Sequence, residues 1–158
     1  MSSPTLYFGQ KDGNTLYRAD QGSSDAGAAY KVIAKPRPVA PAGAGGECIF
    51  RSIYLVVTYS MACVLRVTPI LDGQEFAAEA KDIALTAQPT PVTQRFQIGL
   101  SVGVADSTGT EAIRLAMRGA WFTVKIETVG TLGDGVLELE GIELEYKVVR
   151  ESMDPVTK

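Results

Sequence analysis

The sequence has no histidine and only two cysteines in 158 residues. Histidine is the commonest general base and metal ligand in proteins, so its absence removes the usual Ser-His and Cys-His activation of a nucleophile. Two cysteines without histidine also cannot complete a structural zinc site within one chain. Cys48 and Cys63 lie in apolar, strand-like stretches, which predicts buried free thiols rather than a disulfide, and therefore a reducing compartment.

Long apolar runs and basic segments are also missing. The longest apolar run, residues 53–57, is far shorter than the roughly 20 residues that span a bilayer, and the N-terminus lacks the basic and apolar regions of a signal peptide. The net charge is −3 and the pI is about 5.0, so there is no broad basic footprint for nucleic acid. We therefore expect a protein made in a cytoplasm, with no membrane insertion and no general nucleic-acid binding.

What the sequence does contain is the composition of one globular domain. Hydrophobic residues make up 46% of the chain and charged residues 21%, close to the averages of folded soluble proteins. A chain of this length buries enough apolar surface to fold without a disulfide or a metal. Its glycines form neither a dinucleotide-binding fingerprint nor a phosphate-binding loop. We therefore expect no cofactor, no metal centre and no enzymatic activity.

The chain divides into an arm, a body and a tail. Residues 19–29 are small and polar, and residues 36–46 mix prolines with glycines, so both stretches interrupt the hydrophobic pattern. We assign residues 1–46 to an extended N-terminal arm, residues 47–150 to a β-rich body and residues 151–158 to a C-terminal tail.

The arm has short strand patterns of its own. Residues 5–8 and 15–18 flank an Asp-Gly turn sequence, which predicts a small hairpin. Residues 30–35 form a further candidate strand that needs a partner. The arm carries five basic and three acidic side chains, whereas residues 47–150 carry nine basic and thirteen acidic ones, so opposite net charges of +2 and −4 favour docking on other subunits. The expected contact residues are its large apolar side chains Leu6, Tyr7, Phe8, Leu16, Tyr17 and Tyr30.

Period-two alternation predicts β-strands through the body. Residues 48–59 are apolar at both odd and even positions, which predicts a central strand covered on both faces. Residues 76–85 are interpreted as a connection with a short helical turn. The other predicted strands are residues 61–71, 94–102 and 122–126, each with apolar side chains at alternate positions. Residues 112–118 alternate as well but could also form a helix capped by Thr110, and a strand is the favoured interpretation.

The last strand changes phase partway along. Its apolar residues are Leu137 and Leu139 at odd positions, and then Ile142, Leu144, Tyr146 and Val148 at even ones. One extra residue is needed to keep them all on one face, which predicts a β-bulge near Gly141. Short strands separated by turns, with no helical pattern between them, predict an all-β fold: an antiparallel β-sandwich or a Greek-key barrel with an extended N-terminal arm.

Two groups of acidic residues are the only candidates for chemistry. The first alternates opposite the apolar face of the last strand, which is typical of a solvated strand face more than of a glycosidase acid and base; it consists of Glu138, Glu140, Glu143 and Glu145. The second, Asp12, Asn14 and Asp20, does not have the spacing of an EF-hand loop and is better explained by turn chemistry. We predict neither catalysis nor metal binding at these positions.

Trp121 and the arginines are candidates for recognition. Trp121 beside Phe122 and Arg118 offers a stacking surface for a sugar or base, although core packing is the favoured interpretation. Several arginines at strand positions are either ordinary solvated residues or, if they form a ring, the lining of a lumen; these are Arg51, Arg66, Arg95, Arg114 and Arg118.

Three stretches resemble small β-rich structural proteins of tailed-bacteriophage virions: IFRSIYLVVTYSMACVLRVTPILDG at 49–73, RGAWFTVKIET at 118–128 and GIELEYKVVRES at 141–152. The resemblance implies a repeated subunit of a tail, connector or capsid-decorating layer. It also implies that the partners are copies of itself and other virion structural proteins, with assembly in a host cytoplasm and a final place in the virion. No functional residue is carried over, because such proteins act through surfaces. The alternative is a carbohydrate- or ligand-binding β-sandwich module.

The alternation makes a direct prediction about secondary structure. We expect far-ultraviolet circular dichroism to show a β-rich spectrum, because the strand patterns cover most of residues 47–150. A mainly helical spectrum would contradict the fold class.

Overall fold

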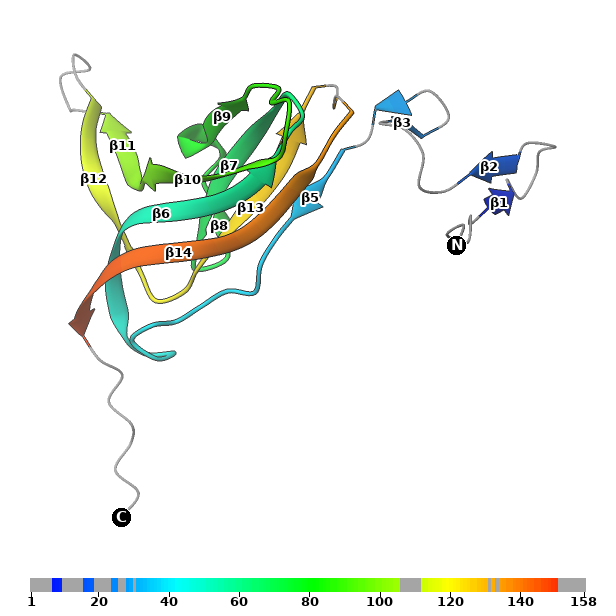
Figure 1. Cartoon of the computed structure of the whole chain (residues 1–158). Helices are drawn as coiled ribbons and strands as arrows, with labels where there is room; N and C mark the ends of the chain where they lie inside the picture. Colours follow the sequence, from blue (N-terminus) through cyan, green and yellow to red (C-terminus); the bar gives the residue numbers. More distant parts are fainter. Residues whose placement is uncertain are drawn as a thin grey trace.

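The structure is a computed structural model, in which the two facing sheets of a β-sandwich dominate (Figure 1). It describes residues 31–105, 112–130, 132 and 134–150, and four short strands before them. Within these residues there is no α-helix, and the one helical element is a 3-10 turn, η1 (Ala77–Glu79). The four short strands are β1 (Tyr7–Gly9), β2 (Leu16–Arg18), β3 (Ser24–Asp25) and β4 (Ala28–Ala29).

Each sheet of the sandwich has five strands, and every described pair is antiparallel. The first sheet consists of β6 (Glu47–Tyr59), β10 (Val92–Gly99), β11 (Ser101–Ala105), β12 (Ala112–Gly119) and β14 (Leu137–Arg150). The second sheet consists of β5 (Ile33–Ala34), β7 (Cys63–Leu71), β8 (Gln74–Glu75), β9 (Lys81–Leu85) and β13 (Phe122–Val129). The predicted all-β sandwich is therefore confirmed.

β6 is the central strand of the first sheet. One of its edges pairs with β14 along its whole length, and the other pairs with β10 from Ser52 to Tyr59 and with β12 from Cys48 to Phe50. Its inward side chains are fully buried and face β13 and β7 of the second sheet. The rings of Phe50 and Phe122 stack with their centroids 4.9 Å apart, so this contact joins the two sheets directly.

The expectation that β6 is covered on both faces is wrong. Its buried residues change parity, from Cys48 and Phe50 to Ile53 and the odd positions after it. The pairing with β14 passes from Ser52 directly to Phe50, so Arg51 is an extra residue of a β-bulge that keeps one apolar face inward. The opposite face is only half-buried: Tyr54 and the even positions after it lie on the outer surface.

The bulge predicted in the last strand is confirmed. Leu139 of β14 pairs with Val57 and Gly141 with the next residue, Val56, so Glu140 is the extra residue. The apolar residues before and after it consequently lie opposite buried residues of β6. A second extra residue, Val149, precedes the end of the strand.

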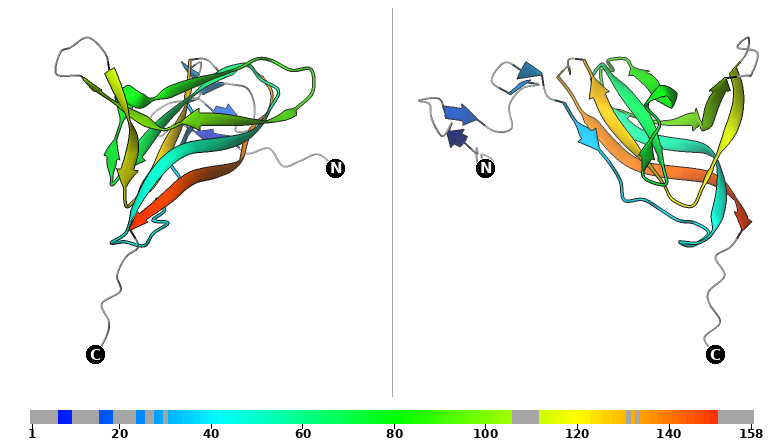
Figure 2. Two further views of the ribbon diagram at one scale, coloured as in Figure 1. Left: turned by 90° about the vertical axis from the view of Figure 1, so that its left-hand side faces the viewer. Right: turned by 180° about the vertical axis from the view of Figure 1, so that it is seen from behind.

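Residues 31–46, which the sequence analysis assigns to the arm, are part of the sandwich. We call them the strap: they run from β5 to the start of β6 along one side of the molecule (Figure 2, right). β5 pairs with β13, Val39 exchanges two backbone hydrogen bonds of 2.9 Å with Phe122, and Ala42 is buried in the core. The arm boundary is therefore corrected from residue 47 to residue 31, because a strand partner was available within the same chain.

The segment before the strap contains two small pairings. β1 pairs with β2, which confirms the predicted hairpin, and β3 pairs with β4. The predicted contact residues Leu6 and Tyr30 lie outside the described residues, and only the backbone is described at the other four.

Two strands of the second sheet were not predicted, the two-residue β8 and the longer β9. β9 follows η1 and pairs with β7, with Asp82 opposite Arg66. The alanines and charges of this region favour a helical turn, and the pairing with β7 supplies the hydrogen bonds that hold it extended instead. The interpretation of residues 76–85 as a connection is correct only for their first half.

The contact between Phe50 and Phe122 makes a prediction about stability. We expect Phe50→Ala to lower the free energy of unfolding by about 3–5 kcal/mol, because it leaves a cavity between two packed sheets. The matched control is Phe96→Ala, at a partly exposed position against the same core, where the loss should be clearly smaller. Equal losses in urea unfolding would contradict the central role of Phe50.

Candidate functional site

One side of the sandwich is left open between an edge strand of each sheet. We define the open side as the region bounded by β14 of the first sheet and by the strap. Most of the large apolar side chains that remain exposed lie on these two segments. They are Val32, Ile33 and Val39 on the strap, and Leu139, Tyr146, Val148 and Val149 on β14.

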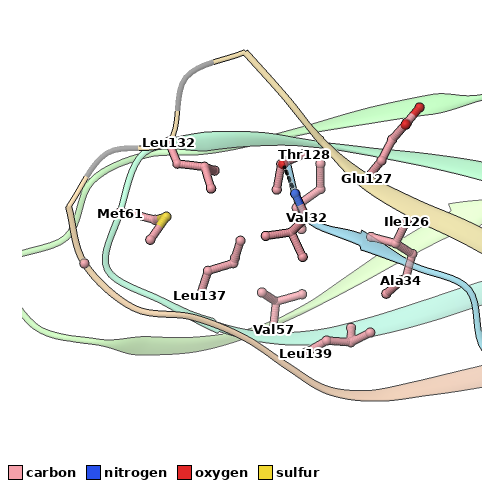
Figure 3. A pocket seen from close by; sticks show the side chains of 12 residues that line it. Val32, Ala34, Val57, Met61, Ile126, Glu127, Thr128, Leu132, Leu137 and Leu139 are labelled. Carbon is pink, nitrogen blue, oxygen red and sulfur yellow. Dashed lines mark hydrogen bonds between the residues drawn. The ribbon is translucent and has the colours of Figure 1, made fainter. Parts of the chain in front are cut away.

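A cavity of about 260 Å³ lies at one end of the open side (Figure 3). Val57 of the first sheet, Ile126 of the second and Val32 of the strap are among the side chains that line it. The Val32 N–H donates to Thr128 Oγ1 at 2.9 Å, and the Thr128 N–H donates to the Val32 carbonyl at 3.0 Å. Because its lining is mostly apolar, with Glu127 and Thr128 as its polar side chains, this cavity suits an apolar group.

β14 has an unpartnered edge. Within the described residues it pairs with β6 alone, so the backbone N–H and C=O groups on its other edge have no strand partner. At its C-terminal end the side chains that face the core side are uncovered: Tyr146 is 44% exposed and Val148 is 37% exposed. A long edge with apolar side chains is a template for pairing with another chain.

The acidic residues of β14 lie on the opposite, outer face. Arg95 connects the outer face of three neighbouring strands: it bonds Glu143 at 2.6 Å and stacks 3.7 Å from the ring centroid of Tyr54. The Tyr54 hydroxyl in turn donates to Glu145 at 3.4 Å. All four glutamates of the predicted group, Glu138, Glu140, Glu143 and Glu145, are exposed. Their position on a solvated face favours the prediction that they are not catalytic.

The arginines do not share one surface. Arg66 belongs to the second sheet, where two hydrogen bonds of 2.8 Å join it to Asp82, whereas Arg51, Arg95 and Arg118 belong to the first. Arg118 bonds Glu47 at 2.6 and 2.8 Å. The side chain of Arg114 lies outside the described residues. Ion pairing on separate strands therefore accounts for Arg66, Arg95 and Arg118 better than the lining of a lumen.

Trp121 is exposed, so the favoured core position is wrong. Its side chain is 42% exposed, while the next residue, Phe122, is buried. The backbone N–H groups of Ala120 and Trp121 donate to Asp72 Oδ1 at 2.9 and 2.8 Å, which fixes the connection between β12 and β13. Trp121 follows Gly119, which pairs with Cys48 near the start of β6, whereas Glu143 pairs with Tyr54 in the middle of that strand.

The two cysteines are buried and free, as predicted. Burial raises the pKa of the Cys63 thiol, so this thiol stays protonated and weakly nucleophilic near neutral pH. No group of three potential metal ligands gathers among the residues that the structure describes. Asp12, Asn14 and Asp20 fall outside that part of the chain.

Comparison with known proteins does not assign the chain to a family. No protein family, curated protein or solved structure matches it. In the part of the chain that is described, no helix has the length and apolar character needed to cross a membrane.

The strap and the β14 edge were the features that sequence analysis missed. The alternation of apolar residues correctly predicted that they share one face of β14. It did not indicate that Tyr146 and Val148 lie beyond the second sheet and are exposed. For the strap, the usable signal was the strand pattern at residues 30–35, which required a partner.

Exposed ion pairs make a prediction about pH. The hydrogen bond from Arg118 lowers the pKa of Glu47 below its ordinary 4.5, that from Arg66 lowers the pKa of Asp82 below 3.8, and that from Lys31 lowers the pKa of Glu127 below 4.5. A depressed folded-state pKa contributes stability that is present above the ordinary value and is lost as pH falls through the folded-state value.

We therefore expect the melting temperature to fall on acidification below about pH 4, and to fall less in 1 M salt, where exposed pairs are screened. The combined variant Glu47→Gln, Asp82→Asn and Glu127→Gln should show a shallower pH dependence, whereas Glu138→Gln should leave the dependence unchanged. An identical acid profile for the native chain and the combined variant would contradict this assignment.

Proposed function

We propose that this chain is a structural subunit of a larger assembly and acts through contacts between subunits. The observation that carries the proposal is the open side, where the long unpartnered edge of β14 and the exposed apolar side chains of the strap lie together. Exposed apolar surface of this kind marks interaction sites, because single soluble domains normally cover it. The outer face, by contrast, is polar and ion-paired.

A virion is the proposed place of this assembly. The support is the resemblance of residues 49–73, 118–128 and 141–152 to small structural proteins of tailed bacteriophages. Under this proposal the partners are copies of the chain and other virion structural proteins, in a tail, a connector or a capsid-decorating layer. A β-sandwich with a free edge strand suits that role, because such an edge can extend a neighbour's sheet.

A ligand-binding module is the second candidate, and two observations favour it. Trp121 offers an exposed ring on which a sugar can stack, and the cavity beside Val32 suits a small apolar ligand. If this role is correct, the chain stays monomeric and Trp121→Ala abolishes glycan binding.

The size of the purified protein tests the first proposal. We expect mass photometry and negative-stain electron microscopy of the full chain to show a discrete assembly several times heavier than the 16.8 kDa monomer. A monomer at every concentration up to the millimolar range would overturn the proposal.

Two truncations separate the arm from the strap. Removing residues 1–30 should leave the sandwich folded, because all ten of its strands lie after that point, and should weaken assembly if the arm docks on a neighbour. Removing residues 1–46 also deletes β5, the Val39 bridge and the buried Ala42, so we expect it to lower the melting temperature as well. Equal melting temperatures for the two truncations would contradict the assignment of the strap to the sandwich.

A further inference from the structure

We infer that the free edge of β14 pairs with β14 of a second copy, antiparallel, about a two-fold axis at Tyr146. This inference rests on the proposed assembly function and names one of its contacts. It joins the first sheets of two copies into one continuous sheet.

The regular part of the edge is short and well defined. Extra residues at Glu140 and Val149 interrupt β14, so the uninterrupted stretch is residues 141–148. Within it the even-numbered residues pair with β6 residues on the core side, and the odd-numbered ones lie on the outer face. Residues opposite each other in an antiparallel pair point to the same face of the sheet. Even-numbered residues must therefore lie opposite even-numbered ones, and odd opposite odd. This requires the two-fold axis to pass through one residue rather than between two.

Charge selects among the registers whose axis lies near the middle of this stretch, at residues 144, 145 or 146. An axis at Leu144 places Glu143 opposite Glu145 twice, and an axis at Glu145 places that carboxylate opposite itself. An axis at Tyr146 places Glu145 opposite Lys147 on both sides, so only opposite charges face each other across the new pairing. Glu143 then keeps its bond to Arg95, at 2.6 Å.

The same register covers the uncovered apolar side chains. Tyr146 lies opposite its own copy, and Leu144 lies opposite Val148. Tyr146 and Val148 are the two core-side residues left exposed on this stretch, so the pairing buries the side chains that the second sheet does not reach. An isologous contact of this kind closes on itself and gives a dimer.

The neighbour's arm is the competing occupant, and charge does not favour it. Residues 1–30 carry two basic and three acidic side chains, a net charge of −1. β14 carries four acidic and two basic side chains, a net charge of −2. Net charge therefore does not favour the arm over a second β14, which is also acidic; what favours the second copy is the pairing of Glu145 with Lys147.

Charge reversal tests the register. Glu145→Lys and Lys147→Glu each place like charges on both sides of the axis, so either variant alone should raise the dimer dissociation constant by roughly tenfold or more. An equimolar mixture of the two variants restores opposite charges at both positions and should form heterodimers of native affinity, measured by analytical ultracentrifugation. The matched control is Lys81→Glu, which reverses the charge of an exposed lysine on β9 in the same way as Lys147→Glu does on β14. It should leave dimerisation unchanged.

Crosslinking tests the position of the axis. Tyr146→Cys should form an intermolecular disulfide rapidly in mild oxidant, because cross-strand neighbours have Cα separations within the range that a disulfide spans. Leu115→Cys, at a similarly exposed apolar position, is the control. Both native thiols are buried and should not react.

The outcomes separate this inference from the proposed function. If the mixture does not recover affinity, or if Tyr146→Cys crosslinks no faster than Leu115→Cys, the inference is wrong. If the chain assembles but only removal of residues 1–30 disrupts it, the arm is the occupant of the edge, and the inference again fails while the assembly function stands. If the native chain never self-associates, the proposed function itself fails.

Discussion

The packing of the inward face of β6 against β13 and β7 is the interaction on which the rest of the structure depends. β6 is hydrogen-bonded on both edges, and its core-side residues are almost completely buried. The stack of Phe50 on Phe122 places that strand against the second sheet. Water is excluded only where one sheet lies over the other. The extent of this contact therefore decides which residues of each strand are buried and which remain exposed at the edges.

The bulges follow from that constraint. A strand that loses its alternation would turn its apolar side chains outward. An extra residue prevents this at Arg51 of β6 and at Glu140 of β14, and β14 has a second extra residue at Val149. The cost is a less regular edge, which leaves residues 141–148 as the regular stretch available for another strand. The geometry that protects the core therefore also limits where a partner can pair.

The two faces of β14 have different roles. Its outer face is polar, and there Arg95 links Tyr54 and Glu143 of two adjacent strands. Such exposed pairs contribute little to stability individually, but they fix the positions of charges beside the free edge. The core-side face continues past the second sheet and leaves Tyr146 and Val148 exposed. Apolar contact would supply affinity at this edge, and the charge pattern would supply its register.

The sequence by itself determined the class of fold, most strand positions, the bulge near Gly141, the buried thiols and the exposed acidic face, because period-two alternation records which side chains meet the core. Only the tertiary structure decided that the strap belongs to the sandwich, that β9 is a strand, that Trp121 is exposed and that Arg51 sits in a bulge. Those features depend on which partner lies across the sheet or above it, and local sequence does not specify partners. The same reason applies to the candidate site: alternation shows that Tyr146 and Val148 share a face with the core, but whether that face is covered depends on the width of the opposite sheet.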